Sequence, residues 1–274
     1  MTGDARALPE AALDDVAYLS RSVNRVRILE TLSEESHTRR SLMDATGVSR
    51  TTLGRILNEL AERGWAERTT DGRYAATRTG GHVVAAFAPT LDAMAAVRSL
   101  GEAADWLPAS VHEVGLDAFR DATVHRPDPN APLSFARELV DRIEDAGTVR
   151  TLTYLAPPEH SVAEVLHERI RDDGVSSEFV LAGGLTEYLV EDPERRGRWR
   201  ASIDAGAAVY GYDDYIPCNL FAIDGTVLVV NTSPEDGSPG AFVESDDQRV
   251  LEWADDLVAR YREEAERIDA GTFA

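Results

Sequence analysis

The stretch from residue 37 to residue 65, HTRRSLMDATGVSRTTLGRILNELAERGW, contains two helical patterns separated by a glycine turn. Thr38 begins a short helix that we expect to run through Ala45, with Leu42 and Met43 as inward residues. Gly47 stands just beyond that helix, where a left-handed C-cap favours glycine. The first part of the stretch therefore predicts a short helix followed by a tight turn.

The second part predicts a longer helix that begins after the N-cap Ser49 and ends at Arg63, before Gly64. Its apolar residues recur with i, i+3, i+4, i+7 spacing and define one face, namely Leu53, Ile56, Leu57 and Leu60. At about 100° per residue, the opposite face presents polar side chains, namely Thr51, Arg55 and Asn58. The helix therefore has one face for a core and one face for another molecule.

The flanking sequence completes a small domain. An apolar helical pattern runs from Asp14 to Leu32, before the quoted stretch. After it, strand-like runs at 65–69 and 73–77 flank Asp71-Gly72, a dipeptide that suits a tight hairpin turn. Three helices followed by a hairpin predict an α+β winged helix-turn-helix domain over residues 1–80.

Such a domain predicts contacts with double-stranded DNA. Arg55 is the favoured base reader, because a guanidinium pairs with guanine O6 and N7. Hydroxyl groups at a helix N-terminus and nearby arginines hold phosphates, and arginines of a wing enter or border the minor groove. The candidate DNA contacts are Arg39, Arg40, Ser49, Arg50, Thr51, Thr52, Arg55, Asn58, Arg68 and Arg73. The alternative is a winged-helix module that binds a protein and has no specific DNA site.

The charge distribution supports this assignment. The chain has a formal net charge of -21, and all 28 of its basic residues are arginine. Residues 1–80 are neutral, and residues 36–80 carry 8 Arg against 5 acids, so the acidity lies in the remainder of the chain. Acid-rich, lysine-free composition is typical of halophilic proteins, in which carboxylates keep the surface hydrated. We therefore interpret the acidity as an adaptation to salt.

The remaining chain predicts a second domain. A helical segment over residues 81–110, bent at Pro89, is expected to link the domains or to pair two subunits. Residues 111–274 alternate helices with strands and predict an α/β domain with a sheet covered by helices. Helices are expected at 133–146, 161–173, around 185–205 and at 248–268, and strands at 148–155, 176–182, 207–212, 218–223 and 226–231.

The second domain carries no pattern typical of an enzyme. Cys218 has no histidine near it in the sequence, and the histidines lack metal-ligand spacing, so we expect no catalytic residues, no metal and no cofactor. A small-molecule effector is the candidate ligand, because phenol and amide groups orient small molecules. The candidate ligand-binding residues are Tyr154, Tyr188, Arg198, Tyr210, Tyr212, Tyr215 and Asn219, which core packing explains about as well.

The runs at 22–32, 37–68 and 71–80 resemble haloarchaeal winged helix-turn-helix transcriptional regulators whose C-terminal half is a FilR-type domain, named for methanogenesis regulators. The resemblance extends more loosely over the whole chain through WLP at 106–108, VHRPDPNAP at 124–132, NLFAIDGTVLV at 219–229 and FVESDD at 242–247. It implies a homodimeric, site-specific transcription regulator with an effector-sensing domain.

The resemblance also implies a distant similarity between the second domain and the phospholipase D fold. That chemistry requires an HxK pair, and a chain without lysine lacks it, so no such activity is expected. The sequence shows no signal peptide and no uninterrupted apolar stretch of about 18 residues. We therefore expect a cytoplasmic protein that does not bind a membrane.

Overall fold

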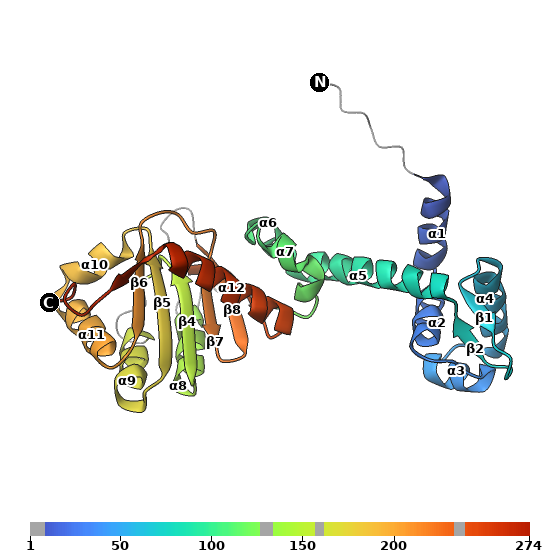
Figure 1. The fold of residues 1–274 in the computed structure, drawn as a ribbon, viewed down its shortest axis with the longest axis horizontal. Coiled ribbons are helices and arrows are strands. Elements are labelled where there is room, and N and C mark those ends of the chain that lie inside the picture. Colours follow the sequence, from blue (N-terminus) through green and yellow to red (C-terminus); the bar gives the residue numbers. More distant parts are fainter. Residues whose placement is uncertain (1–8, 127–133, 157–161, 233–238) are drawn as a thin grey trace, which may run out of the picture. The chain divides into compact units, whose positions relative to one another are not determined.

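A computed structural model describes residues 9–126, 134–156, 162–232 and 239–274 of the chain (Figure 1). The chain divides into two units, Met1–Leu91 and Asp92–Ala274. Each unit has its own core, so each is described separately.

The N-terminal unit is a set of helices with a two-stranded hairpin. Helix α3 has an N-cap hydroxyl on Thr38, which accepts a hydrogen bond from the Ser41 amide, and it ends at Gly47 with φ 68°. The hairpin strands pair antiparallel, with Glu67 opposite Ala75. The elements are α1 (Glu10–Ser20), α2 (Val23–Glu34), α3 (Arg39–Thr46), α4 (Arg50–Glu62), β1 (Ala66–Arg68), β2 (Tyr74–Ala76) and the beginning of α5 (Arg78–Leu100). The predicted winged helix-turn-helix architecture is therefore present.

The core of this unit joins the helices to the hairpin. The buried residues come from α1, α2, α3, α4 and β1 and from Phe87 of α5. Trp65 packs edge-on against Tyr18, with ring centroids 5.8 Å apart. Gly80 lies so close to the hairpin that an added Cβ would be 1.9 Å from the carbonyl oxygen of Trp65. Glycine is therefore required where α5 passes β1.

One predicted helix forms as two. The pattern over residues 14–32 predicted a single helix, but α1 ends at Ser20 and α2 begins at Val23. Ser22 has an extended backbone, with φ -157° and ψ 115°. The break contains neither glycine nor proline, so the local sequence does not signal it.

The C-terminal unit contains an eight-stranded mixed sheet covered by helices. Its strands are β3 (Thr123–His125), β4 (Thr148–Thr153), β5 (Ser176–Ala182), β6 (Ala208–Tyr212), β7 (Asn219–Ile223), β8 (Thr226–Thr232), β9 (Pro239–Ser245) and β10 (Glu266–Ile268). Its helices are α6 (Ala103–Trp106), α7 (Val111–Val114), η1 (Leu116–Phe119), α8 (Ser134–Glu144), α9 (Glu164–Asp173), α10 (Leu185–Glu191), α11 (Pro193–Asp204) and α12 (Gln248–Glu264).

The strand order is β10-β6-β5-β4-β7-β8-β9-β3. β4 pairs parallel with β5, and β5 pairs parallel with β6, with Val149 opposite Ser177 and Phe179 opposite Val209. The other pairings are antiparallel. The parallel strands and the helices between them place the carboxyl ends of β4, β5 and β6 at one edge of the sheet.

Both faces of the sheet are buried. One face packs against residues of α8, α9, α10 and α11, and the other packs against α12 and the short helices that follow α5. Figure 1 shows α12 crossing one face of the sheet. Val250, Trp253 and Leu257 of α12 are buried there. The prediction of a sheet covered by helices is confirmed, and the similarity to phospholipase D stays a prediction.

Three strands were absent from the sequence prediction. β3 and β9 form one edge of the sheet, and β10 forms the other edge. β10 lies where the sequence predicted the end of a helix over 248–268. β10 and β3 are held by pairing with distant strands, with Ile268 opposite Val209 and Val124 opposite Val243, so helical periodicity did not reveal them.

Helix α5 contains the boundary between the two units, which falls between Leu91 and Asp92. This boundary lies inside the segment 81–110 that was expected to link the domains or to pair two subunits. Among the described residues α5 is also the one helix long and apolar enough to cross a membrane, judged by length and composition alone, and 17% of that stretch is buried. Several of its apolar side chains are exposed, among them Met94 and Val97.

Candidate nucleic-acid interface

Helix α4 presents the polar face that the sequence predicted. Leu53, Ile56, Leu57 and Leu60 are buried in the core, whereas Thr51, Arg55 and Asn58 are exposed. The Ser49 hydroxyl accepts a hydrogen bond from the Thr52 amide at 3.4 Å and donates one to the Thr52 hydroxyl at 3.0 Å. Ser49 and Thr52 therefore fix the start of the helix, and Thr51 is the hydroxyl available beside it.

Arg55 is held in place by a network that begins in α1. Its guanidinium donates to Glu59 at 2.7 Å, and Glu59 also accepts from Arg25 and Tyr18, each at 3.1 Å. Partial burial alone would raise the pKa of Glu59, but these hydrogen bonds and the charge of Arg25 outweigh it and lower the pKa. Glu59 is therefore anionic near neutral pH and orients Arg55, whose side chain remains 56% exposed.

Tyr18 of this network has a raised pKa, in contrast to the lowered pKa of Glu59. Burial and the bond to Glu59 raise the pKa of Tyr18 to about 12, so Tyr18 remains a donor to the carboxylate. Arg25 and Arg63 lie over the Tyr18 ring, with the guanidinium carbons 4.0 and 4.2 Å from its centroid. These contacts connect the packing of α1 and α2 to the position of α4.

The other predicted phosphate-contacting arginines differ in their partners. Arg40 and Arg50 are exposed and form no hydrogen bond or ion pair with a described residue. Arg39 donates to the hydroxyl of Tyr74 at 3.0 Å and lies over its ring. Arg40 and Arg50 are thus available to phosphates, and Arg39 is placed between α3 and the hairpin.

The two wing arginines have different surroundings. Arg68 is exposed and donates weakly to the Gly72 carbonyl, at 3.4 Å. Arg73 is half-buried and donates to Ser36, through Nε to the hydroxyl at 2.9 Å and through both Nε and Nη2 to the carbonyl oxygen. Arg68 is therefore positioned to reach a groove, whereas Arg73 fastens the wing to the loop before α3 instead of extending from it.

Gly54 was not among the predicted contacts. It lies within α4, between Leu53 and Arg55, and an added Cβ would meet no atom within 4 Å. Glycine inside a helix is destabilising relative to alanine, and no packing in the unit requires it here. On the helix it lies at the edge of the face that carries Thr51 and Asn58. The structure thus shows room for a side chain at Gly54 and no packing reason for glycine there.

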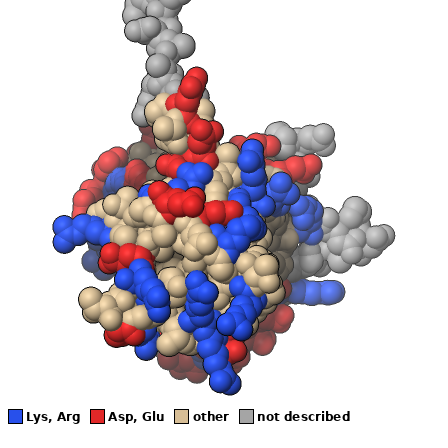
Figure 2. Space-filling view, turned by 90° about the vertical axis from the view of Figure 1, so that its right-hand side faces the viewer, with Lys and Arg blue, Asp and Glu red and all other residues tan. Residues whose placement is uncertain are grey.

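Basic side chains gather on one side of this unit. Figure 2 shows arginines over the lower and right-hand parts of the face in view, with most acidic groups across its upper part. The unit contains 12 Arg and 12 acidic residues over Met1–Leu91, so the separation of the charges and not an excess of arginine produces the patch. Such a patch attracts phosphates while the unit as a whole stays neutral.

The candidate ligand residues do not form one group. Tyr154 and Asn219 meet where β4 ends, because the side-chain Oδ1 of Asn219 accepts a hydrogen bond from the backbone amide of Tyr154 at 3.0 Å. Tyr210 and Tyr212 pack with the core beneath α12, and Tyr215 is 76% exposed.

Tyr188 and Arg198 belong to α10 and α11. Tyr188 is bound by Arg195, which donates to its hydroxyl at 2.9 Å, and Arg198 pairs with Glu194 at 3.2 Å. Tyr154, Tyr210 and Tyr212 pack against the same cluster of buried residues, to which Tyr188 and Arg198 do not belong, and the assignment of these residues to a ligand stays a prediction.

The remaining nucleophilic and titratable groups are structural. Cys218 is buried, and burial raises its pKa to about 12, so the thiolate that a nucleophile requires is disfavoured. His167 is bonded to the Ser202 hydroxyl at 2.7 Å inside the core. Within the described ranges no group of three or more His, Cys, Asp or Glu side chains is arranged to hold a metal ion.

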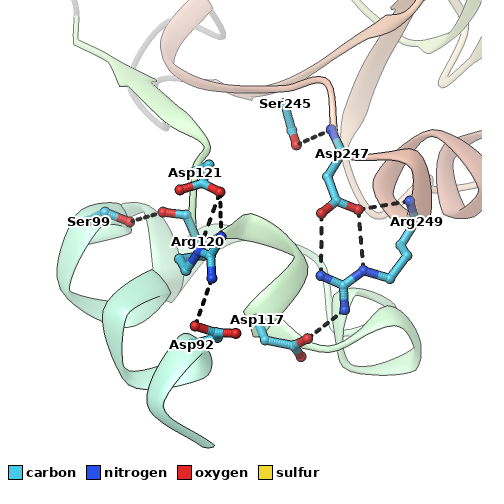
Figure 3. A network of polar contacts seen from close by, with 8 residues as sticks. All are labelled: Asp92, Ser99, Asp117, Arg120, Asp121, Ser245, Asp247 and Arg249. Carbon is cyan, nitrogen blue, oxygen red and sulfur yellow. Dashed lines mark hydrogen bonds and ion pairs between the residues drawn. The ribbon is translucent and has the colours of Figure 1, made fainter. Parts of the chain in front are cut away.

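Ion pairs attach the last part of α5 to the sheet of the C-terminal unit (Figure 3). Arg120, just after η1, donates to Asp92 of α5 at 2.9 Å. Arg249, at the start of α12, donates to Asp117 of η1 at 2.5 Å. Asp121 and Asp247 complete the two arginine sites. Ion pairs therefore connect α12 to η1, and the residue after η1 to α5.

Comparison with known protein families gives two matches. Residues 13–99 match the family model described as the HVO_A0261 N-terminal domain. Residues 129–264 match the model described as the middle domain of methanogenesis regulatory protein FilR1. No curated protein sequence matches the chain.

Solved structures match the chain at low identity and low structural similarity. TrmBL2, an archaeal chromatin protein, is 16% identical, with 92% of this chain and 98% of that chain covered and a TM-score of 0.41. An IclR homologue from Microbacterium sp. strain HM58-2 is 13% identical, with coverage of 90% and 96% and a TM-score of 0.24. The dimethyltransferase RosA from Streptomyces davawensis is also 13% identical, with coverage of 74% and 79% and a TM-score of 0.24.

These scores support no conclusion about activity. The family matches extend over most of the chain, and their boundary agrees with the two units of the structure. The chain therefore combines an HVO_A0261-type N-terminal domain with a FilR1-type middle domain.

Proposed function

We propose that this chain is a sequence-specific DNA-binding transcription regulator. The observation that carries the proposal is the exposed face of α4, on which Thr51, Arg55 and Asn58 lie opposite the buried leucines. A helix with this arrangement, preceded by a turn and followed by a wing, fits the major groove with its N-terminal half. Arg55 reads a guanine, and Asn58 and Thr51 contact a neighbouring base or phosphate.

The surrounding arginines set the register of the complex. Arg40 and Arg50 bind phosphates, because their guanidinium groups are exposed and have no partner among the described residues. Arg39 contributes from the junction of α3 and the wing, and Arg68 borders the minor groove. Arg73 holds the wing against Ser36 and acts on DNA through that position.

The regulatory role of the C-terminal unit is supported by the family match, because FilR1 is named as a methanogenesis regulatory protein. Its described residues contain no group of three or more His, Cys, Asp or Glu side chains arranged to hold a metal ion. We infer that it senses a small molecule and passes the signal to α5 through η1 and α12. The cytoplasm is the compartment in which such a regulator works.

The active form in this proposal is a homodimer that binds an inverted repeat. α5 provides the pairing surface, because Met94 and Val97 are 62% and 43% exposed. The alternative helix, α12, buries its apolar face on the sheet of its own unit. The acidic composition of the C-terminal unit adapts it to high salt, in which its repulsion from DNA is screened.

The decisive experiment compares Arg55→Ala with Arg40→Ala. Occupancy of the genome by the tagged protein identifies the site, and fluorescence anisotropy then measures affinity for that site and for scrambled DNA. Arg55→Ala should lose about 1–3 kcal/mol on the specific site and little on scrambled DNA. Arg40→Ala should weaken both by similar factors, because a phosphate contact carries no sequence information.

Two results would contradict the proposal. Equal losses on both DNAs for Arg55→Ala would remove Arg55 as a base reader. An absence of discrete genomic sites for the wild-type chain would favour the second candidate, a winged-helix module that docks a protein partner. In that case Thr51→Ala, Arg55→Ala would leave DNA association unchanged.

A further inference from the structure

A cavity of about 50 Å³ lies inside the C-terminal unit, between the sheet and the helices on one of its faces. Its walls come from α8, α9, α10 and α11 and from strands β4, β5 and β7, and they include Leu139, Leu166, Phe179, Leu185 and Trp199. One water molecule needs roughly 10–15 Å³ of such space. The cavity therefore has room for a small molecule of a few non-hydrogen atoms.

The lining excludes a charged occupant. Every described residue that lines the cavity is apolar except two threonines, and none carries a charge. An ion in apolar surroundings without a counter-charge is strongly disfavoured. An occupant must therefore be uncharged and mostly apolar.

The two threonines form a polar strip on the cavity side of β4. Thr151 is 3% exposed, and its hydroxyl has no hydrogen-bond partner among the described residues. The Thr153 hydroxyl donates to the side-chain Oδ1 of Asn219 at 2.9 Å. Asn219 is 1% exposed, and its amide nitrogen also has no partner within the described part of the chain.

An unpaired hydroxyl in a cavity wall is uncommon in a folded protein, because burial removes its hydrogen bond to water. An acceptor atom on an occupant would restore that bond for Thr151. The strip also lies at the carboxyl end of β4, beside a strand that runs parallel to it. Sheets with parallel strands commonly bind ligands at this edge.

We propose that this cavity binds a small, uncharged, mostly apolar molecule that carries one hydrogen-bond acceptor, such as a ketone or an ester. Thr151 is the anchoring donor, and Leu166 and Trp199 enclose the apolar part. This inference rests on the proposed regulatory role of the C-terminal unit and names the chemical class of its effector. It replaces the tyrosines predicted from the sequence as the ligand site.

The test uses the full chain with ¹³C-labelled leucine, valine and isoleucine methyl groups. Dissolved xenon reports whether the cavity accepts an apolar atom, and 2-butanone reports whether it accepts a ketone. Both probes should shift methyl signals of Leu139 and Leu166. Sodium propanoate, which has a similar size but is charged, should shift neither.

The variant Thr151→Val keeps the shape of the side chain and removes the hydroxyl. It should weaken 2-butanone binding about two- to tenfold, the loss expected for one hydrogen bond, and leave xenon binding unchanged. Ser177→Ala is the matched control, because Ser177 also has a buried hydroxyl without a described partner but does not line this cavity. It should leave both probes unaffected, and xenon binding shows that each variant is folded.

The inference is overturned if 2-butanone shifts no cavity methyl group, if Thr151→Val binds it as tightly as the wild type, or if propanoate binds equally well. DNA affinity, measured on the same samples, separates this result from the proposed function. If the protein binds DNA but not 2-butanone, the cavity proposal is wrong and the proposed function as a regulator is unaffected. If it binds 2-butanone but not DNA, the cavity proposal is supported and the proposed function is contradicted.

Discussion

Gly54 is the residue of α4 that the packing of the N-terminal unit does not explain. An alanine Cβ there meets no atom within 4 Å, so Gly54→Ala should stabilise the helix by roughly 0.5–1 kcal/mol. If the helix backbone lies against DNA at this point, the added methyl group should also weaken binding to the specific site several-fold. Thermal unfolding and anisotropy on the same variant measure the two effects.

Gly81→Ala is the matched control for this prediction. Gly81 is also inside a helix, and an added Cβ there meets nothing within 4 Å, but it lies on α5. It should gain similar stability without any loss of DNA affinity. Unchanged DNA binding by Gly54→Ala would show that DNA does not approach the backbone at that point.

His167 gives a pH dependence that belongs to a single side chain. Burial, followed by the charges of Arg198 and Arg171, lowers its pKa from 6.5 to about 4. The unfolded chain therefore binds the proton more tightly, and the contribution to stability is complete above pH 6.5 and is lost as the pH falls toward 4. The loss is on the order of 3 kcal/mol at about 1.4 kcal/mol per pH unit.

The measurement is the free energy of urea unfolding of the C-terminal unit between pH 7 and pH 4.5. Wild type should lose stability over this interval, and His167→Gln should show a much smaller slope although it is less stable at pH 7. A variant with the wild-type slope would assign the pH dependence to other groups.

Among the elements, α5 depends on one glycine to pass the hairpin. An alanine Cβ at Gly80 would lie 1.9 Å from the Trp65 carbonyl oxygen, which is backbone and cannot turn aside. Gly80→Ala should therefore lower the melting temperature of the N-terminal unit, because it should reduce the free energy of unfolding by about 1–3 kcal/mol. Gly81→Ala, its neighbour, should raise it, and stabilisation by both substitutions would contradict the close contact.

Pairing through α5 is a second prediction for this element. Met94→Glu places a charge in the exposed apolar part of the helix and should convert the dimer into a monomer, which light scattering after size exclusion measures. Ala95→Glu is the matched control, because Ala95 is exposed on a different side of the same helix. A wild-type chain of monomeric mass, or a dimer that persists in Met94→Glu, would exclude this interface.

The whole molecule carries its charge unevenly. Residues 92–274 contain 16 Arg and 37 acidic residues, a net charge of -21, whereas residues 1–91 are neutral. Repulsion among these carboxylates destabilises the C-terminal unit in dilute buffer, and at about 1 M salt the screening length falls to about 3 Å.

The thermal midpoint of this unit should therefore rise by several degrees between 0.1 and 2 M KCl. Circular dichroism at 222 nm measures it. NaCl should act equally if screening is the cause. A midpoint that does not respond to salt would contradict the interpretation of the acidity as an adaptation to salt.

The sequence by itself determined the elements whose signals are local. The N-cap Ser49, the turn at Gly47 and the leucine spacing of α4 defined the helix-turn-helix, and the structure confirms it. Thr38, predicted as the first residue of its helix, is instead the N-cap of α3. Strands β4 to β8 were also predicted, because apolar runs bounded by turn residues signal them, whereas β3, β9 and β10 were not. Which face of α4 is exposed followed from periodicity alone.

The tertiary structure decided what depends on distant partners. β10 pairs with β6 although its residues continue a helical pattern, and Arg73 is held by Ser36, which is 37 residues away. The cavity beside Thr151 arises where helices from separate parts of the chain fail to fill the space over β4. Local patterns fix the conformation of a segment, but long-range packing fixes which side chains meet, and that choice has no local signature.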